Sequence, residues 1–169
     1  DSAIAISGQR SWPQQPLRAG ELTLVLDDIR DPGNLGTILR LADWYGVTQV
    51  VCSPTTAEWQ APKVIAASMG SFLRMPLLVR ELTEFLAQAK ADGAEVLGAV
   101  LDGENMHRLR QPMAKAVGAV LVIGNESHGL SAEVQALLTR RLTIPRFGQA
   151  ESLNAGVATG ILLDGWRRA

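Results

Sequence analysis

The sequence offers little that would make a disulfide, a metal cluster or a membrane anchor. It contains one cysteine, Cys52, which excludes an intramolecular disulfide and a cysteine-ligated metal site and fits a reducing cytoplasm. We expect Cys52 to be a buried, inert thiol. No apolar run approaches the roughly 20 residues that cross a bilayer, and the first ten residues lack the basic start and long apolar stretch of a signal peptide. We therefore predict a cytoplasmic protein without a membrane segment.

The sequence also lacks a net excess of charge. Its 16 Lys and Arg residues are nearly balanced by 17 Asp and Glu residues, which gives a formal net charge of −1. The whole chain therefore exerts no general attraction on nucleic acid, and a nucleic-acid role would need local basic patches, a neighbouring domain or a second subunit. The chain begins at Asp1 instead of Met, so we expect it to start inside a longer natural protein or after processing.

Several common catalytic and cofactor signatures are missing. Neither GxGxxG nor GxxxxGK[ST] occurs, which argues against a dinucleotide-binding oxidoreductase and an NTPase. His107 and His128 are isolated, and no His, Asp or Glu group has metal-ligand spacing, so we predict no metal site. Ser127 beside His128 suggests a hydrolase, but the nucleophile elbow needs glycine two residues before the serine, and no glycine stands there. We reject the hydrolase.

The composition and the periodicity predict one α/β domain. The chain has 169 residues, 47% hydrophobic and 20% charged, which suits a single core. Residues 1–20 are predicted to be a linker or N-terminal arm, and residues 21–169 the domain. Strands are expected at 21–29, 49–52, 76–79, 95–101, 119–124 and 141–144, and helices at 34–45, 63–69, 82–91, 132–138 and 153–166. The near-continuous apolar strands predict a mainly parallel sheet with helices on both faces.

Three polar segments interrupt this pattern. In the first, residues 28–40, Asn34 is placed to cap a helix, and Arg40 follows nearly two turns later on a neighbouring face. Gly36 lies in the first helical turn, where glycine costs about 0.5–1 kcal/mol relative to alanine, so we expect something to approach the backbone closely there. The plain alternative is a turn, a cap and a solvated arginine.

The second segment, residues 123–131, follows a strand, and α/β proteins place ligands at the carboxyl ends of strands. The third, residues 144–154, leads into the last helix. On the plain interpretation, Ser152 or Asn154 caps that helix and Ser131 caps the one before it.

Taken together, the segments resemble the three motifs of the SpoU/TrmH branch of SPOUT methyltransferases. Residues 34–40 are similar to N-x-G-x-[IL]-x-R, residues 124–130 to G-x-E-x-x-G-[LM], and residues 144–154 to I-P-x-x-G-x-x-x-S-L-N. The motifs occur in the family's order. In two respects the chain departs from the family pattern. Arg146 stands where methionine is frequent, and the residues before Leu22 are too few for the N-terminal RNA-binding domain of many relatives, so we expect such a domain to lie outside this sequence.

The resemblance implies an S-adenosylmethionine-dependent RNA ribose 2′-O-methyltransferase acting on tRNA or rRNA, with a C-terminal trefoil knot. A non-catalytic RNA-binding relative is the alternative. By motif position the catalytic residues would be Arg40, Asn34, Glu126, Ser152 and Asn154, and the cofactor-binding residues Ala99, Gly124, Ile144 and Leu153. Arg40 would clamp the phosphate beside the target ribose and stabilise the developing alkoxide, because a guanidinium stays protonated and makes a poor base. Glu126 would pair with Arg40 or anchor its loop, or, less favoured, act as the base.

The last helix predicts a homodimer. It carries Leu153, Val157, Ile161, Leu162 and Trp166, which is more apolar surface than one short helix needs for its own packing. In relatives the active site lies near the dimer interface. Two subunits would also join scattered arginines into a basic face despite the net charge; these are Arg10, Arg18, Arg140, Arg141, Arg146, Arg167 and Arg168.

Overall fold

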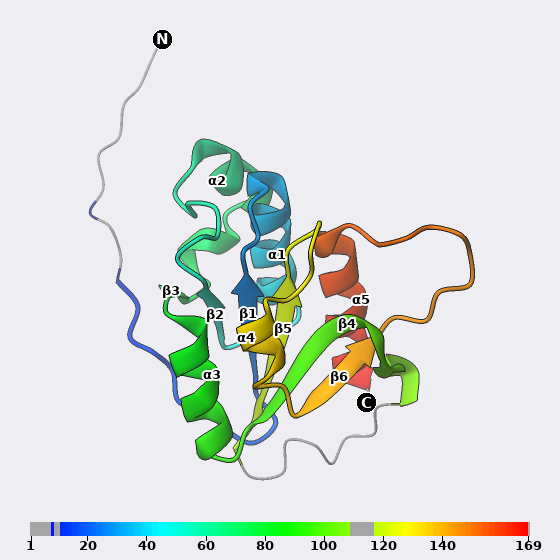
Figure 1. Cartoon of the computed structure of the whole chain (residues 1–169). Coiled ribbons are helices and arrows are strands. Elements are labelled where there is room, and N and C mark those ends of the chain that lie inside the picture. Colours follow the sequence, from blue (N-terminus) through cyan, green and yellow to red (C-terminus); the bar gives the residue numbers. More distant parts are fainter. Residues whose placement is uncertain (1–7, 9–10, 109–116, 169) are drawn as a thin grey trace.

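The computed structural model describes residues 8, 11–108 and 117–168, and its centre is a six-stranded sheet in the order β3-β2-β1-β5-β4-β6 (Figure 1). The strands are β1 (Leu22–Asp27), β2 (Gln49–Cys52), β3 (Leu77–Val79), β4 (Glu95–Asn105), β5 (Ala119–Gly124) and β6 (Arg140–Thr143). Neighbouring strands pair in parallel throughout the described part of this sheet. The predicted mainly parallel sheet is confirmed.

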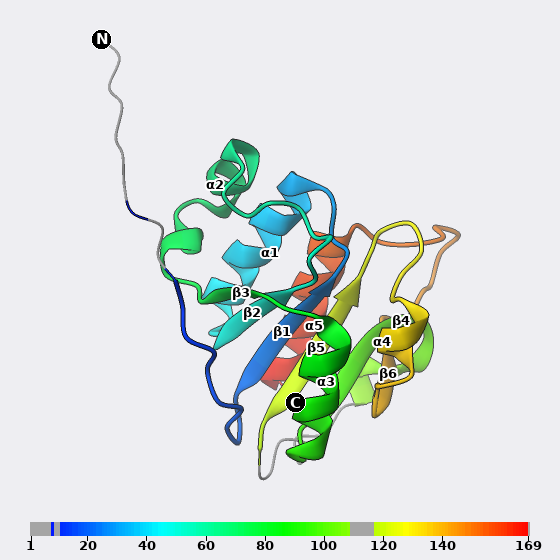
Figure 2. The same ribbon diagram turned by 60° about the vertical axis from the view of Figure 1, so that its left-hand side comes forward.

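Helices cover both faces of the sheet, as predicted. The α-helices are α1 (Pro32–Trp44), α2 (Pro62–Ser68), α3 (Leu82–Ala91), α4 (Ala132–Gln135) and α5 (Ala155–Arg168), and two 3₁₀ turns are η1 (Ser71–Leu73) and η2 (Met106–Arg108). α1, α2 and α5 share one apolar core with the sheet, and α3 and α4 share a second core on the opposite face. Figure 2 shows α3 in front of the sheet and α5 behind it.

Side-chain alternation along β1 divides these two cores. Leu22, Leu24 and Leu26 face the α1 side, whereas Val25 faces the α3 side, and all four are almost fully buried. A strand buried on both faces cannot show the apolar–polar alternation of a half-exposed strand. The apolar run in residues 21–29 therefore indicated a buried strand of a parallel sheet.

The first turn of α1 differs from the sequence-based prediction. The N-cap is Asp31, whose Oδ1 accepts a hydrogen bond of 2.8 Å from the backbone N of Asn34. Pro32 occupies the first helical position, where its missing N–H costs nothing. The prediction that Asn34 caps the helix was therefore wrong, and the correction leaves the Asn34 side chain available for other contacts.

Gly36 confirms the expected close approach. A Cβ at this position would lie 2.5 Å from the Cβ of Ala67 and 2.7 Å from the backbone O of Val64, both in α2. The missing side chain therefore lets α2 pack directly on α1. The neighbour that approaches is a helix of the same chain.

The elements near β6 also differ from their predicted bounds. α4 ends at Gln135 instead of residue 138, and Thr139 N donates to Val96 O (2.8 Å), which ties the chain to β4 where β6 begins. Ser131 stands at the N-cap position, but its hydroxyl donates to Asp27 Oδ2 (2.8 Å) and makes no cap hydrogen bond. β4 continues past the expected end at residue 101, since β6 pairs with it again after an irregularity between Ala99 and Glu104.

The segment before β1 has neither helix nor strand in its described residues 8 and 11–20. It nevertheless rests on the domain: Gln15 N donates to Gln49 Oε1 (2.8 Å), and Trp12 and Leu17 pack against the α3-side core. The boundary at residue 20 and the trefoil knot stay predictions. Within the described part of the chain, no helix has the length and apolarity needed to cross a membrane.

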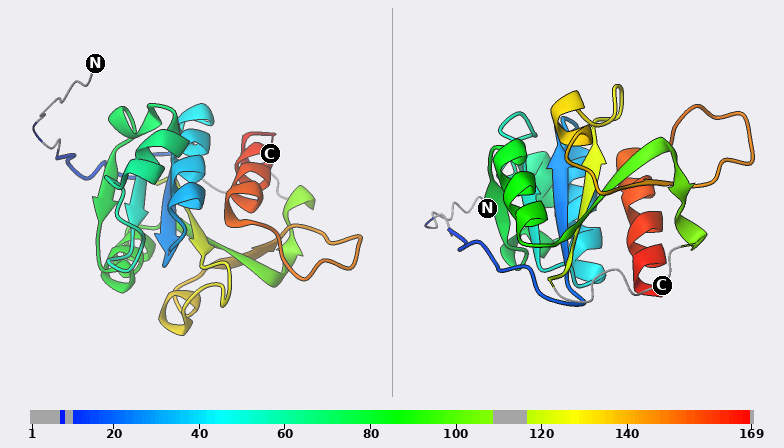
Figure 3. Two further views of the ribbon diagram at one scale, coloured as in Figure 1. Left: turned by 90° about the horizontal axis from the view of Figure 1, so that it is seen from above. Right: turned by 60° about the horizontal axis from the view of Figure 1, so that its bottom comes forward.

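The position of α5 matters most for the site. α5 lies beside α1: Gly156 is next to Thr37, and Gly160 is next to Leu41. Figure 3 shows the two helices side by side, and the connection from β6 to α5 looping away from the sheet. This packing brings the start of α5 close to the start of α1.

Candidate active site

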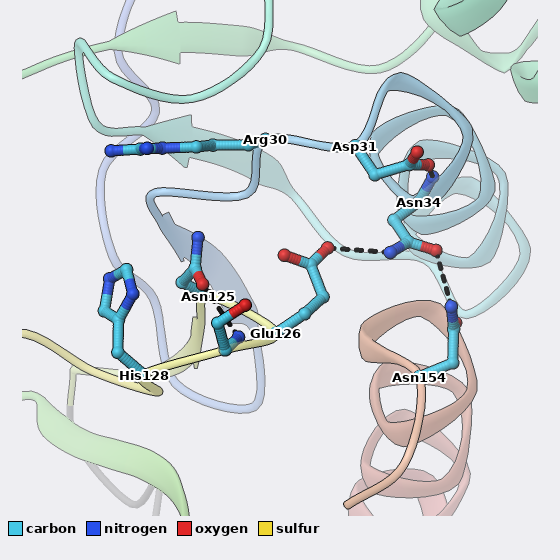
Figure 4. A pocket seen from close by; sticks show the side chains of 8 residues that line it. Arg30, Asp31, Asn34, Asn125, Glu126, His128 and Asn154 are labelled. Atoms are coloured by element: carbon cyan, nitrogen blue, oxygen red, sulfur yellow. Dashed lines mark hydrogen bonds between the residues drawn. The ribbon is translucent and has the colours of Figure 1, made fainter.

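A pocket of about 630 Å³ opens at the carboxyl ends of β1 and β5. From β1 the chain builds the sheet outward through β2 and β3, and the later strands lie on the other side of β1. The crevice at such a reversal is where open α/β sheets bind ligands. The pocket is lined by Arg30, Asp31, Asn34, Asn125, Glu126, Ser127, His128 and Asn154 (Figure 4).

Three predicted catalytic residues meet in this pocket. Asn34 Nδ2 donates to Glu126 Oε1 (2.7 Å), and Asn154 Nδ2 donates to Asn34 Oδ1 (2.8 Å). The three side chains come from α1, the loop after β5 and the residue before α5, so each sequence segment contributes one. Asn34 uses both ends of its amide, which fixes its orientation between the other two.

Asn154 has a second function in the same position. Its Oδ1 accepts hydrogen bonds from the backbone N of Gly156 (2.9 Å) and of Val157 (3.2 Å), which caps α5. The capping prediction is confirmed, and different atoms of one amide make the cap and the contact with Asn34. Any disturbance of the cap would move the amide that contacts Asn34.

The other end of the pocket is organised around Asp28. This residue has φ +61°, in the left-handed region, which aspartate tolerates better than most side chains. Its carboxylate accepts from Arg30 Nε (2.9 Å, Oδ1) and lies 3.4 Å from His128 Nε2 (Oδ2). Asn125 Nδ2 donates to its backbone O (2.7 Å) and to Oδ2 (3.2 Å). Asp28 therefore connects the loop after β1 with the loop after β5.

These contacts determine the charge state of the aspartates. Burial acts to raise the pKa of Asp28, but hydrogen bonds from Arg30 and Thr55 and the charges of Arg30 and His128 together hold it below its usual value. The pKa of Asp31 is lowered mainly by the backbone N–H of Asn34, with a further contribution from the ammonium of Lys63. Both groups are carboxylates at neutral pH.

Arg40 and Ser152 lie outside this hydrogen-bonded group. Both are exposed, neither lines the pocket, and neither side chain makes a hydrogen bond or ion pair with the residues that the structure describes. Arg40 is six residues after Asn34 in α1, so the helix turns it away from the pocket by about a third of a revolution. A contact between Arg40 and Glu126 is not formed in this chain alone, and the catalytic roles stay predictions.

The predicted cofactor residues lie along a different part of the same sheet edge. Gly124 ends β5 and Ile144 follows β6. Ala99 lies in the middle of β4, where it pairs with Leu142 of β6 and follows Gly98, the partner of Val122 in β5, so the three residues lie on adjacent strands. Ala99 and Ile144 are half-buried and pack against the α1-side core. Leu153 is 47% exposed, just before α5. None of the four lines the pocket that contains Asn34.

Gly124 has a local structural reason to be glycine. A Cβ there would lie 2.5 Å from the backbone N of Leu130, because the loop after β5 folds back and Asn125 pairs with Gly129. The absence of a side chain closes this loop, which presents Glu126, Ser127 and His128 to the pocket.

Asp28, Arg30 and Asn125 are site residues that the sequence did not predict, and His128, which is isolated in the sequence, lines the pocket with them. Their convergence depends on the left-handed backbone at Asp28, which no spacing rule reveals. The available signal was the acidic pair Asp27-Asp28 directly after a buried strand, at the end of the sheet where ligands bind. No group of three or more His, Cys, Asp or Glu side chains is arranged to hold a metal ion among the described residues.

Comparison with known proteins identifies the family of this chain. The profile of the SpoU rRNA Methylase family matches residues 21–164. The chain is 34% identical over 151 residues to the 23S rRNA (guanosine(2553)-2′-O)-methyltransferase of Bacillus subtilis, covering 89% of this chain and 60% of the relative. It is 32% identical over 149 residues to the 23S rRNA (guanosine-2′-O-)-methyltransferase of Neisseria meningitidis, covering 87% and 58%. The chain thus spans less than two thirds of these relatives.

The solved structures give the same result. The AdoMet-bound rRNA methyltransferase of Sinorhizobium meliloti superposes with a TM-score of 0.87 at 34% identity, covering 95% of this chain and 61% of that one. The match therefore includes the sheet, its helices and the three polar segments. The chain belongs to the SpoU rRNA methylase family.

Proposed function

We propose that the protein transfers the methyl group of S-adenosylmethionine to a ribose 2′-hydroxyl of tRNA or rRNA. The observation that carries this proposal is the connected set Asn34, Glu126 and Asn154, in which three separate sequence segments supply one side chain each to a single pocket. Two of the relatives are named as guanosine 2′-O-methyltransferases of 23S rRNA, which supports the same chemistry. A cytoplasmic location belongs to the same proposal.

The residues of this chain would mainly position the reactants. When bound, S-adenosylmethionine supplies a methyl group on a sulfonium, and the ribose oxygen must approach it in line at about 3–3.5 Å. Glu126 and the two asparagines would form a fixed polar surface that orients the hydroxyl. Ser152, two residues before Asn154, would help to orient the same hydroxyl. The Arg40 guanidinium would bind phosphate beside that ribose and stabilise negative charge on its oxygen.

The four predicted cofactor-binding residues suit the chemistry of S-adenosylmethionine. Ala99, Ile144 and Leu153 offer small or apolar surfaces, and Gly124 exposes backbone without a side chain. Such a lining suits an adenine ring, which needs backbone hydrogen bonds and apolar contact more than charge. These residues would hold the cofactor, next to the pocket that would hold the ribose.

The working form that we propose is a homodimer through α1 and α5. Trp44 is 82% exposed and Val157 52% exposed, and they lie on adjacent helices. Arg40 lies one turn before Trp44 on the same side of α1. In the dimer Arg40 would act from this interface, which explains why it makes no contact with the pocket of its own chain.

Two measurements test the function. Calorimetry should detect binding of S-adenosylmethionine or its demethylated product without added metal. Incubation with total RNA and the labelled methyl donor, followed by digestion to nucleosides, should yield 2′-O-methylated nucleosides. Label found in methylated bases would contradict the ribose target, and RNA binding without cofactor binding or transfer would support the non-catalytic alternative.

A further inference from the structure

Arg30 is the arginine inside the pocket, and its guanidinium is only partly used. Its Nε donates to Asp28 Oδ1 at 2.9 Å, and its side chain is 69% exposed. Its Nη1 and Nη2 atoms make no hydrogen bond to any of the described residues. A guanidinium has five N–H donors, so four remain, arranged as a planar fork suited to two oxygens of one anion.

Asp28 holds this fork in place. Its carboxylate is 11% exposed, and its oxygens already accept from Arg30 and Asn125. Its own backbone is fixed by Ser53, whose Oγ accepts from Asp28 N at 3.0 Å. The Asp28 charge is thus surrounded by donors of its own chain, while the outer edge of Arg30 stays directed to solvent and to the pocket. Orientation by a buried partner reduces the entropy that Arg30 loses when it binds a ligand.

The position of Arg30 in the pocket indicates which part of the RNA its free N–H groups would contact. Arg30 and His128 lie toward one end of the pocket, and Asn34, Glu126 and Asn154 lie toward the other (Figure 4). An RNA ribose has a phosphate on each side, so a ribose at the Asn34 end places a backbone phosphate further along the same pocket. Asp31, the nearest remaining carboxylate on this loop, is paired with Lys63 at 3.6 Å.

We propose that Arg30, held by Asp28 and facing His128, binds a backbone phosphate next to the target ribose. It is a second phosphate contact, distinct from the one assigned to Arg40, and it rests on the proposed function. Arg30 is a positioning residue: it would fix the register of the RNA strand so that one ribose reaches Glu126 and Asn34.

Salt dependence of binding tests the contact directly. The probe is a single-stranded RNA of twelve nucleotides, titrated without cofactor at several salt concentrations. Each phosphate neutralised on a single strand contributes about 0.7 to the slope of log K against log salt. We expect Arg30→Gln to lower affinity severalfold and to reduce the slope by about that amount. Arg80→Gln removes the same charge at another exposed position after β3 and should keep the slope.

Two further comparisons separate the explanations. With a neutral methylphosphonate backbone, Arg30→Gln and the unmodified protein should bind equally; a difference that persisted would assign Arg30 to a base. Asp28→Asn removes a negative charge and keeps a residue that tolerates the left-handed backbone. It should nevertheless weaken binding, because Arg30 loses its anchor. Tighter binding would overturn the anchoring role.

Methyl transfer to total RNA distinguishes this contact from the activity itself. Arg30→Gln should raise the RNA concentration needed for half-maximal rate by about tenfold, with cofactor affinity unchanged. If the unmodified protein transfers no methyl group but Arg30→Gln still flattens the salt slope, the function fails and the phosphate contact stands. If transfer occurs and Arg30→Gln changes neither the slope nor the half-maximal concentration, the phosphate contact fails and the function stands.

Discussion

At the residue scale, Arg40 and Asn34 show how one helix serves two surfaces. Asn34 faces the pocket, where it joins Glu126 and Asn154. Arg40 is exposed, and its side chain makes no hydrogen bond or ion pair with the described residues. Because the Arg40 side chain is exposed and unpaired among the described residues, its replacement should affect activity without affecting the stability of the fold.

We expect Arg40→Ala to reduce methyl transfer by about 10²-fold or more, the scale of losing one preorganised electrostatic donor. Thermal stability should change by no more than about 0.5 kcal/mol, because the side chain is exposed. Arg40→Lys should restore little, since an ammonium cannot reproduce a planar two-pronged contact. Single-turnover transfer, measured beside a melt and a cofactor titration, decides this. Normal turnover would return Arg40 to being a solvated helix residue.

Asn154 allows its cap to be separated from its contact with Asn34. Asn154→Ala removes both and should cost about 1 kcal/mol of stability from the lost cap. Asn154→Ser retains a capping oxygen but is too short to reach Asn34, so it should keep most of the stability and still lose activity. Chemical denaturation and methyl transfer are measured on both variants. If Asn154→Ser were fully active, the Asn34 contact would have no part in the reaction.

At the element scale, the packing of α2 on α1 depends on Gly36. Helix propensity alone favours Gly→Ala by about 1 kcal/mol. Here the added Cβ would stand 2.5 Å from Ala67 and 2.7 Å from the Val64 backbone, closer than folded proteins allow. We expect Gly36→Ala to destabilise the fold by about 1–3 kcal/mol through overpacking, measured by urea unfolding.

Gly160 in α5 provides the matched control. A Cβ there would lie 3.5 Å from both Leu41 methyl groups, an ordinary contact distance. Gly160→Ala should therefore be neutral or stabilising by up to about 1 kcal/mol. Equal effects at both glycines would show that the distance between helices does not decide the outcome.

At the scale of the whole molecule, ion pairs make the fold sensitive to acid. Hydrogen bonds from Arg74 are the main cause that lowers the pKa of Asp43, and hydrogen bonds from Arg141 and Arg140 do the same for Asp102 and Glu104.

The ion pairs of Asp102 and Glu104 also occupy Arg141 and Arg140, two members of the predicted basic face. Arg10, another member, lies outside the described residues. A continuous basic surface therefore depends on the remaining arginines and on dimerisation.

The sign of the pH effect follows from these shifts. A carboxylate whose pKa is lower in the folded state binds protons more readily when unfolded, so its stabilisation is present above the unfolded value and lost as pH falls toward the folded value. We expect the free energy of unfolding to decrease below about pH 4. Asp43→Asn and Arg74→Gln should each flatten this decrease in urea titrations across pH 5 to 3. An unchanged slope in both variants would contradict the assignment.

The proposed dimer is tested at Trp44. Trp44→Glu places a charge on the exposed surface of α1 and should weaken association by about thirtyfold or more, as expected for an aromatic at an interface centre. The monomer fold should persist, because Trp44 packs on little of its own chain. Val79→Glu, on a strand at the other end of the sheet, is the control. Sedimentation that gave a monomer for the unmodified protein at micromolar concentration would refute the dimer.

The sequence by itself determined the succession of strands and helices along the chain and the parallel sheet. It also identified Asn34, Glu126 and Asn154, which meet in the pocket. Apolar periodicity encodes which faces are buried, and the family motifs identify polar residues that periodicity cannot explain. The Asp31 cap of α1 is a local contact with Asn34, and the sequence Asp31-Pro32 already carries its signal. Tertiary structure alone decided that α2 rests on Gly36 and that Asp28 joins Arg30 to the loop after β5. These features depend on one left-handed backbone angle and on ångström-scale approaches between segments distant in the chain, and neither is written in local spacing.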